Sequence, residues 1–307
     1  MHDLQNRLIA KIHDEPIVDY FFLRKSLSEL VDTLEGLEFK KVGTSRDIPF
    51  DAAVKGYFGA EDNTGAKWII KPITNKDDAL YHRCAEIVYL LDFAMHTLSA
   101  PTVVLTIDGK RYRGSKVVPN AINISSYDYI QDPFSKVIVA DLINRWLSFD
   151  EDRNPNNYMV IQNSKSYPIV VAIDFDKSDL DSEEMKIVGT EDKFGWIRHE
   201  KNRYLTLYKA EHFDQLSIES FEDRLQSAMA LDLVQFQSIC ERLFEGFCDE
   251  PKIKATRIIN NISKRRDYIN TYFRTWFKIA DPSVRAKETE EYSGFGKTFL
   301  KMYQKKE

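Results

Sequence analysis

The sequence predicts an α+β protein of two lobes, in which an antiparallel sheet with one helix precedes a mostly helical part. Strand-like runs separated by turn sequences fill most of residues 37–120, and a single long helical pattern interrupts them. From residue 218 onward, apolar residues recur mainly at helical spacing. A chain of 307 residues is long enough for two lobes that each bury a core.

Composition limits the classes of function. Hydrophobic residues make up 43% of the chain and charged residues 30%, which is typical of a globular protein and excludes a disordered one. A net charge of -5 gives no direct signal for nucleic acid or an anionic membrane as the main partner. The sequence has neither a run of about 18 apolar residues nor a secretory signal, so we expect no membrane span and a cytoplasmic location. Three cysteines without paired spacing favour a reducing compartment.

The first 120 residues are expected to form two helices and then the sheet. The helices cover Leu4–Ile12 and Phe21–Leu34, the second ending at Gly36, and together they make an extension over residues 1–36. Residues 37–120 then form a lobe of five strands and one helix. These elements are Phe39–Val42, Ala53–Phe58, Trp68–Ile73, the helix Asp77–Ser99, and the hairpin Thr102–Ile107 with Arg111–Val118.

The second lobe is predicted over residues 121–285, followed by a charged tail over 286–307. It begins with a helix at Val137–Leu147 and a polar loop at Ser148–Asn157. The remaining elements are two short strands, Tyr158–Ile161 and Ile169–Ile173, and three helices, Phe221–Leu231, Val234–Phe247 and Ala255–Phe277.

Three polar residues around the short strand pair have the pattern that phosphoryl transfer needs. Asp152 and Asn157 have the spacing D-x-x-x-x-N, and Asp174 follows the second strand. Phosphoryl transfer needs one carboxylate to orient the attacking hydroxyl and oxygen ligands that hold magnesium on the phosphates. Because the two strands pair as a hairpin, we expect Asn157 and Asp174 to lie at the same edge. The plainer alternative is a solvated acidic turn after the helix.

Lys71 and Glu86 form a second candidate set. Lys71 ends an otherwise apolar strand, and Glu86 lies in the following helix near its apolar side. A buried glutamate needs a partner, and Lys71 is the natural candidate, because the pair would keep the ammonium pointed at phosphate oxygens. The alternatives are a solvated lysine at a strand end and a glutamate on the helix surface.

The order of these residues resembles the protein-kinase-like superfamily, in the branch that contains HipA-like kinases and the phosphoinositide lipid kinases. The segment from Asp152 to Asn157 resembles the D-R-H-x-x-N loop of the lipid kinases, with Asn154 in place of the histidine. Ile173-Asp174-Phe175-Asp176 resembles their I-D-F-G, with Asp176 in place of the glycine. Glu86 and Tyr89, on a helix that runs into Leu98-Ser99-Ala100-Pro101, are closer to HipA-like proteins. The likeness covers roughly residues 37 to 280.

This resemblance implies a bilobal protein-kinase-like fold that uses ATP and Mg²⁺. It implies that Asp152 is the catalytic base and that Asn157 and Asp174 ligate magnesium. Lys71 would bind the α- and β-phosphates, and Glu86 would hold Lys71 in place. The adenine would lie against the connector near Val118. The first hairpin lacks G-x-G-x-x-G, so Ser45 and backbone amides would grip the phosphates there.

The favoured function is phosphorylation of a hydroxyl, with Ser or Thr of a protein substrate as the expected acceptor. Some HipA-like kinases have a neutralising partner protein, and such a partner is an open expectation here. Two alternatives remain. Asn154 and Asp176 would mark lost catalysis in a nucleotide-binding pseudokinase or interaction module. A phosphoinositide or small-molecule kinase is the other, although the acidic stretch from Asp174 to Glu184 disfavours a membrane substrate.

Overall fold

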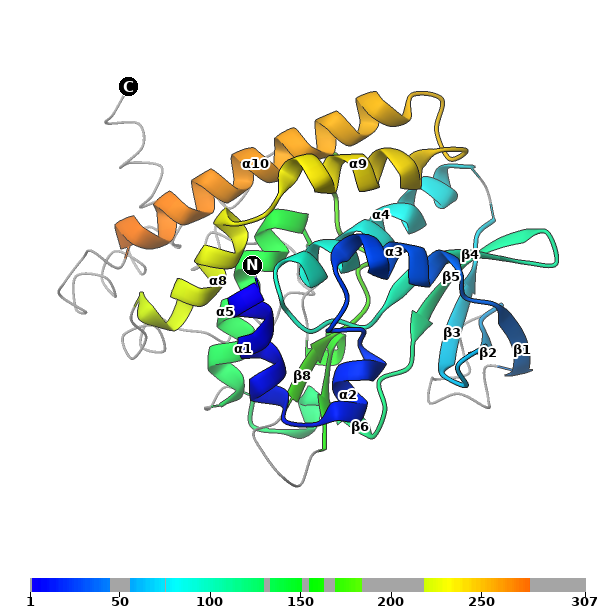
Figure 1. Cartoon of the computed structure of the whole chain (residues 1–307), viewed down its shortest axis with the longest axis horizontal. Coiled ribbons are helices and arrows are strands. Elements are labelled where there is room, and N and C mark those ends of the chain that lie inside the picture. Colours follow the sequence, from blue (N-terminus) through cyan, green and yellow to red (C-terminus); the bar gives the residue numbers. More distant parts are fainter. Residues whose placement is uncertain are drawn as a thin grey trace. The chain divides into compact units, whose positions relative to one another are not determined.

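The computed structural model separates the chain into two compact units. The first unit contains residues 1–122, 159–176 and 232–256, and the second contains residues 123–158, 177–231 and 257–307. The elements of both are drawn in Figure 1 and confirm the predicted α+β class. The structure describes residues 2–44, 56–74, 76–129, 133–150, 155–162, 169–183 and 218–276.

The first unit is built on a five-stranded antiparallel sheet. Its strand order is β1-β2-β3-β5-β4. The tight turn between β2 and β3 is held by Asp62, whose side chain accepts hydrogen bonds from the backbone of Thr64 at 2.8 Å and from the Trp68 indole at 2.8 Å. Trp68 and Ile70 are fully buried in the sheet. The strands are β1 (Phe39–Thr44), β2 (Phe58–Asp62), β3 (Lys67–Pro72), β4 (Thr102–Ile107) and β5 (Lys110–Lys116).

Gly114 is required in the middle of β5 because the core packs tightly over it. A Cβ atom at this position would lie 2.8 Å from Leu105 Cδ2 and 3.2 Å from both Ile70 and Trp68. A larger residue would therefore push apart the apolar side chains that hold β3, β4 and β5 together.

The first unit also contains helices that pack against this sheet and against one another (Figure 1). Helix α4 (Lys76–Ala94) contacts β4, and both α3 (Leu27–Glu35) and α9 (Leu233–Phe244) contact α4. Helix α3 starts with a capping box between Ser26 and Glu29, and it buries Leu30, Val31 and Leu34.

The N-terminal extension differs from the expected pair of helices. Helix α1 (His2–Ile12) is present, but a short helix α2 (Glu15–Tyr20) follows it directly, capped by Asp14. The first helix ends at Ile12 as expected, and Pro16 lies in the first turn of the new helix α2, where proline is well tolerated. Phe22 then adopts a left-handed backbone with φ of 59°, which ends α2 and separates it from α3.

The second strand also begins later than expected. Gly56 has a φ of 88° and lies in a turn, so β2 starts at Phe58 and continues to Asp62. The earlier part of the expected strand, residues 53–55, lies outside the described residues.

A second, three-stranded sheet has the order β6-β7-β8. Its strands are β6 (Ala121–Asn123), which the sequence pattern did not predict, β7 (Tyr158–Ile161) and β8 (Ile169–Ala172). The end of β8 pairs with the segment that follows α4: the Ala172 N–H donates to the Leu98 carbonyl at 3.1 Å, and Ala100 N–H donates to the Ala172 carbonyl at 2.9 Å. This pairing ties β8 and the residues after it to the first unit.

The second unit is mostly helical. Helix α5 (Phe134–Ser148) packs against α8 (Glu219–Met229), and Arg224 of α8 donates a hydrogen bond of 2.5 Å to the Asn144 side chain. Helix α10 (Pro251–Trp276) contributes its residues from Arg257 onward, where Ile258, Ile262 and Ile269 are buried. Among the residues that the structure describes, no helix has the length and apolarity needed to cross a membrane.

Candidate functional site

Strand register places two cations side by side in the first unit. Lys71, near the end of β3, is directly paired with Arg113 of β5. Directly paired residues of neighbouring strands project from the same face of a sheet. Both side chains are buried, with Lys71 9% and Arg113 1% exposed. Two buried cations on one face need negative charge nearby.

Two carboxylates from the segment after β8 supply that charge. The Lys71 Nζ lies 3.2 Å from Asp174 Oδ1 and 2.9 Å from Asp176 Oδ2. Arg113 forms an ion pair with Asp176 Oδ1, and its other terminal nitrogen lies 3.8 Å from Asp174 Oδ1. We call these four residues the charge cluster. It joins β3 to a segment that lies more than one hundred positions later in the chain.

The two carboxylates have opposite electrostatic environments. Loss of water and the neighbouring Asp176 raise the pKa of Asp174, although 41% of its side chain stays exposed. For Asp176, burial acts in the same direction, but Arg113 and Lys71 outweigh it and hold its pKa well below the usual range. Asp176 is therefore the more tightly bound anion of the pair, and Asp174 is the more accessible one.

The backbone around Asp174 helps to direct both carboxylates toward the cations. Asp174 adopts a left-handed conformation with φ of 57°, which aspartate tolerates better than most residues. The next side chain, Phe175, is 2% exposed and anchors the segment in the core. Asp174 and Asp176 both reach Lys71 on either side of this anchor.

The expected pair between Lys71 and Glu86 is not present. Glu86 is 1% exposed, forms an ion pair with Arg83 one helical turn earlier, and accepts a hydrogen bond of 3.2 Å from the Val104 backbone. The register explains this, because Val104 lies opposite Arg113 and Arg113 lies opposite Lys71. Glu86 thus binds the edge strand β4, about 10 Å across the sheet from β3, and Arg83 neutralises it.

The connector after β5 contacts the N-terminal extension. The Val117 N–H donates to the Lys67 carbonyl at 2.9 Å, and the Tyr20 hydroxyl donates to the Val117 carbonyl at 2.5 Å. Val118, the residue expected to line the adenine site, follows directly and is half-buried. Its role stays a prediction. The contact shows that the extension, for which the sequence assigned no role, packs against this part of the unit.

Lys116 ends β5 inside a group of aromatic rings. Its Nζ donates to the Tyr20 carbonyl at 2.8 Å and lies 4.0 Å and 4.2 Å from the ring centroids of Tyr20 and Phe22. Burial lowers the pKa of Lys116 from 10.5 to about 8, only partly opposed by Asp62. The protonated lysine is thus held in a site that does not favour its charge.

Stability is therefore expected to depend on pH through Lys116. Because the pKa is lower in the folded protein than in the unfolded chain, the unfolded chain binds more protons between pH 8 and 10.5. Stability relative to a Lys116→Met variant should then rise with pH in this window. From pH 7 to 9.5 the wild type should gain on the order of 1–2 kcal/mol over the variant. Denaturant unfolding of both proteins at these two pH values measures this, and a constant difference would contradict it.

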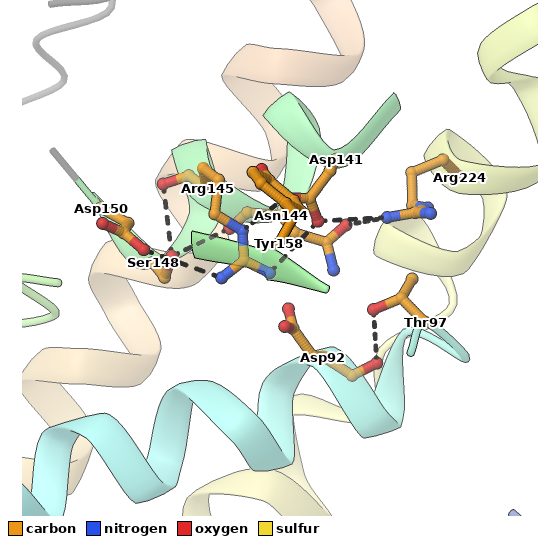
Figure 2. A network of polar contacts seen from close by, with 9 residues as sticks. All are labelled: Asp92, Thr97, Asp141, Asn144, Arg145, Ser148, Asp150, Tyr158 and Arg224. Carbon is orange, nitrogen blue, oxygen red and sulfur yellow. Dashed lines mark hydrogen bonds and ion pairs between the residues drawn. The ribbon is translucent and has the colours of Figure 1, made fainter. Parts of the chain in front are cut away.

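In the second unit, the chain that leads to Asp152 is held by a buried polar network (Figure 2). Arg145 and Asp150 have fully buried side chains, and their charged atoms lie 3.9 Å apart. The Arg145 Nε also lies 3.2 Å from Asp141 Oδ2, and Tyr158 donates a hydrogen bond to the same carboxylate. Phe149 ends α5 in a left-handed conformation with φ of 49°. Asp150, two positions before Asp152, is thus fixed at the end of a well-packed helix.

Arg265 of α10 links the end of α5 to the residues that follow Asp176. Arg265 is 2% exposed and donates hydrogen bonds of 3.1 Å to the Leu147 carbonyl and 3.3 Å to the Asp179 carbonyl. Asp179 N–H donates in turn to the Phe149 carbonyl at 3.0 Å. Burial lowers the pKa of Arg265 to about 10, because its partners are mainly carbonyl groups. One buried cation therefore joins two segments that flank the candidate site residues.

The remaining predicted site residues are placed as follows. Asn157 is 7% exposed and directly precedes β7, in the second unit. Its expected approach to Asp174 stays a prediction. Asp152 and Ser45 lie outside the described residues.

The oxygen donors among the predicted site residues are of the chemical kind that binds magnesium together with phosphates. In the described ranges, no group of three or more His, Cys, Asp or Glu side chains is arranged to hold an ion. Magnesium is usually bound by one or two carboxylates together with substrate phosphates. Asp174, with its partly exposed carboxylate, and Asn157 are oxygen donors of the kind that this mode requires.

Sequence reasoning missed Arg113. The strand that contains it was predicted, but an arginine on a strand gave no signal by itself. The pairing of β3 with β5 places Arg113 directly opposite Lys71, and because these strands belong to different hairpins, no local sequence pattern indicates it.

The comparisons with known proteins show the fold. Neither a protein-family model nor a curated protein matches the sequence. Among solved structures, the crystal structure of a Helicobacter pylori proinflammatory kinase, CtkA, is similar to this chain with a TM-score of 0.51 and 10% sequence identity. The match covers 84% of this chain and 98% of that chain. At this identity the likeness shows a kinase-like fold, in agreement with the predicted fold class.

Proposed function

We propose that the chain is a kinase that uses ATP and Mg²⁺ to phosphorylate a hydroxyl group, with Ser or Thr of a protein as the acceptor. The observation that carries the proposal is the direct contact between Lys71 on β3 and Asp174 after β8, at 3.2 Å. A buried lysine beside a partly exposed carboxylate, on a kinase-like fold, is the pair that binding of a metal-nucleotide complex requires.

Each residue has a defined role in this proposal. Lys71 binds the phosphates once the nucleotide is present, and Asp174 and Asn157 hold magnesium. Magnesium, when bound, neutralises charge on the phosphates. Asp152 orients the acceptor hydroxyl and accepts its proton. Exclusion of water from the reacting groups would strengthen these electrostatic interactions.

The proposal is tested by incubating the full chain with labelled ATP and Mg²⁺ in the presence of protein and lipid pools. We expect label on protein, and we expect Asp152→Ala to reduce it by at least about a hundredfold while Mg-ATP still binds. An Asp128→Ala variant, which changes an exposed aspartate, is the control. Label on lipid alone would reject the protein substrate, and unchanged transfer by Asp152→Ala would reject the catalytic base.

A second candidate, a nucleotide-binding pseudokinase, is favoured by one observation. Lys71 is held by two carboxylates, and Asp176 stands where the lipid-kinase pattern has glycine. Mg-ATP that raises the melting temperature of the chain without any transfer to protein or lipid would select this function.

A further inference from the structure

The charge cluster contains one carboxylate and one cation more than the proposed function uses. Asp174 and Lys71 have roles toward magnesium and phosphate, whereas Arg113 and Asp176 have none. Both carboxylate oxygens of Asp176 are engaged, Oδ1 by Arg113 and Oδ2 by Lys71. With two cations and two carboxylates the cluster is neutral before any nucleotide binds.

We propose that Arg113 is the permanent partner of Asp176, and that Asp176 is a positioning residue for Asp174 rather than a magnesium ligand. This inference rests on the proposed function and assigns roles to two further residues of the same site. Arg113 is 1% exposed and cannot follow a ligand into solvent, and its nearest carboxylate belongs to Asp176.

The charges of the site explain why such a partner is needed. When Lys71 binds phosphate, both of its carboxylate partners lose a cation. Asp174 can then bind magnesium, but Asp176 would be left as a largely buried anion close to a triphosphate. A buried charge without a partner strongly destabilises the folded protein. Arg113 removes this cost because it stays with Asp176.

The geometry also indicates that Asp174, and not Asp176, is the residue available to bind a metal. The Asp176 side chain is 25% exposed, against 41% for Asp174. Arg113 forms an ion pair with Asp176 Oδ1 and Lys71 lies 2.9 Å from its Oδ2, so both oxygens of this carboxylate are already paired with cations. Asp174 lies one residue from the buried Phe175 and is turned by its left-handed backbone. Fixing Asp176 therefore fixes the direction of Asp174.

The first experiment measures melting temperatures of the nucleotide-free full chain for Arg113→Met, Asp176→Asn and the double variant. Breaking a buried pair by removing its cation should lower the melting temperature by about 5 °C or more in Arg113→Met. The double variant should recover at least half of that loss, because no unpaired anion remains. Arg111→Met is the matched control, since Arg111 lies on the same strand but is exposed and contacts Phe247.

The second experiment measures ATP affinity at increasing Mg²⁺ for the wild type, Asp174→Asn and Asp176→Asn. We expect Asp174→Asn to remove most of the magnesium dependence and Asp176→Asn to keep it. Arg113→Met should weaken Mg-ATP binding about tenfold or more, with partial rescue by Arg113→Lys and by the double variant. A role of Arg113 in stability alone would leave the Mg-ATP affinity of the folded Arg113→Met variant unchanged.

The outcomes separate this inference from the proposed function. A double variant that is no more stable than Arg113→Met overturns the pairing. The same conclusion holds if neither Arg113→Met nor the double variant folds. Loss of magnesium dependence in Asp176→Asn overturns the positioning role. A wild type that binds no Mg-ATP overturns the proposed function, whereas the melting temperatures of the nucleotide-free proteins still decide whether Arg113 and Asp176 form the pair.

Discussion

Replacing Asp174 by alanine is expected to reduce phosphate transfer by at least about a hundredfold, because the residue is proposed to hold the metal that neutralises the transferring group. The variant should also lose the magnesium-dependent part of ATP binding. Lys71 keeps Asp176 as a partner at 2.9 Å, so the nucleotide-free protein should remain folded. Transfer assays with labelled ATP, together with ATP binding at low and high Mg²⁺, measure both effects.

The control for this prediction is Asp128→Ala, which removes an exposed carboxylate that is not part of the charge cluster. Its transfer rate and its magnesium dependence should match those of the wild type. Full activity in Asp174→Ala would reject the assignment of the metal site, whatever the other variants show. Loss of activity with an unchanged magnesium dependence would mean that Asp174 acts in another role.

The positions of Lys71 and Asp174 at strand ends could be predicted, because each lies beside an apolar run in the sequence. No local rule gives their direct contact, because β3 and β8 belong to different sheets. The partner of Glu86 could not be predicted in the same way. It depends on which strand pairs with β3, and β5, which follows β4 in the chain, is inserted between β3 and β4 in the sheet. Register across three strands is not visible in a local pattern.

The N-terminal extension gives a second case of this limit. Its helical periodicity was recognised, but the pattern around Phe22 reads equally well as a continuous helix. Tyr20, the last residue of α2, contacts the end of β5: its hydroxyl donates to the Val117 carbonyl, and its ring centroid lies 4.0 Å from Lys116 Nζ. Tertiary contacts override local propensity at this position. The role of Arg113 likewise follows only from its pairing with Lys71 on the neighbouring strand.

Arg145→Met is expected to have the largest effect on stability in the second unit. Arg145 and Asp150 have fully buried side chains, and Arg145 also pairs with Asp141 (Figure 2). Removing the cation takes the Arg145 charge away from two buried carboxylates, those of Asp141 and Asp150. We expect this to lower the free energy of unfolding by about 3–5 kcal/mol. That is a large part of the total stability of about 5–15 kcal/mol that a folded protein has. Denaturant unfolding of the variant and the wild type measures this loss.

The matched control is Arg257→Met, because Arg257 also pairs with an aspartate, Asp181, at 2.9 Å but keeps 48% of its side chain exposed. An exposed pair contributes about 0–1 kcal/mol, so this variant should unfold close to the wild type. Equal losses in the two variants would show that burial of Arg145 does not set its contribution. Because Asp150 lies two positions before Asp152, the Arg145 variant should also lose phosphate transfer under conditions where it is still folded. Transfer that survives there would show that the network stabilises the unit without directing the catalytic loop.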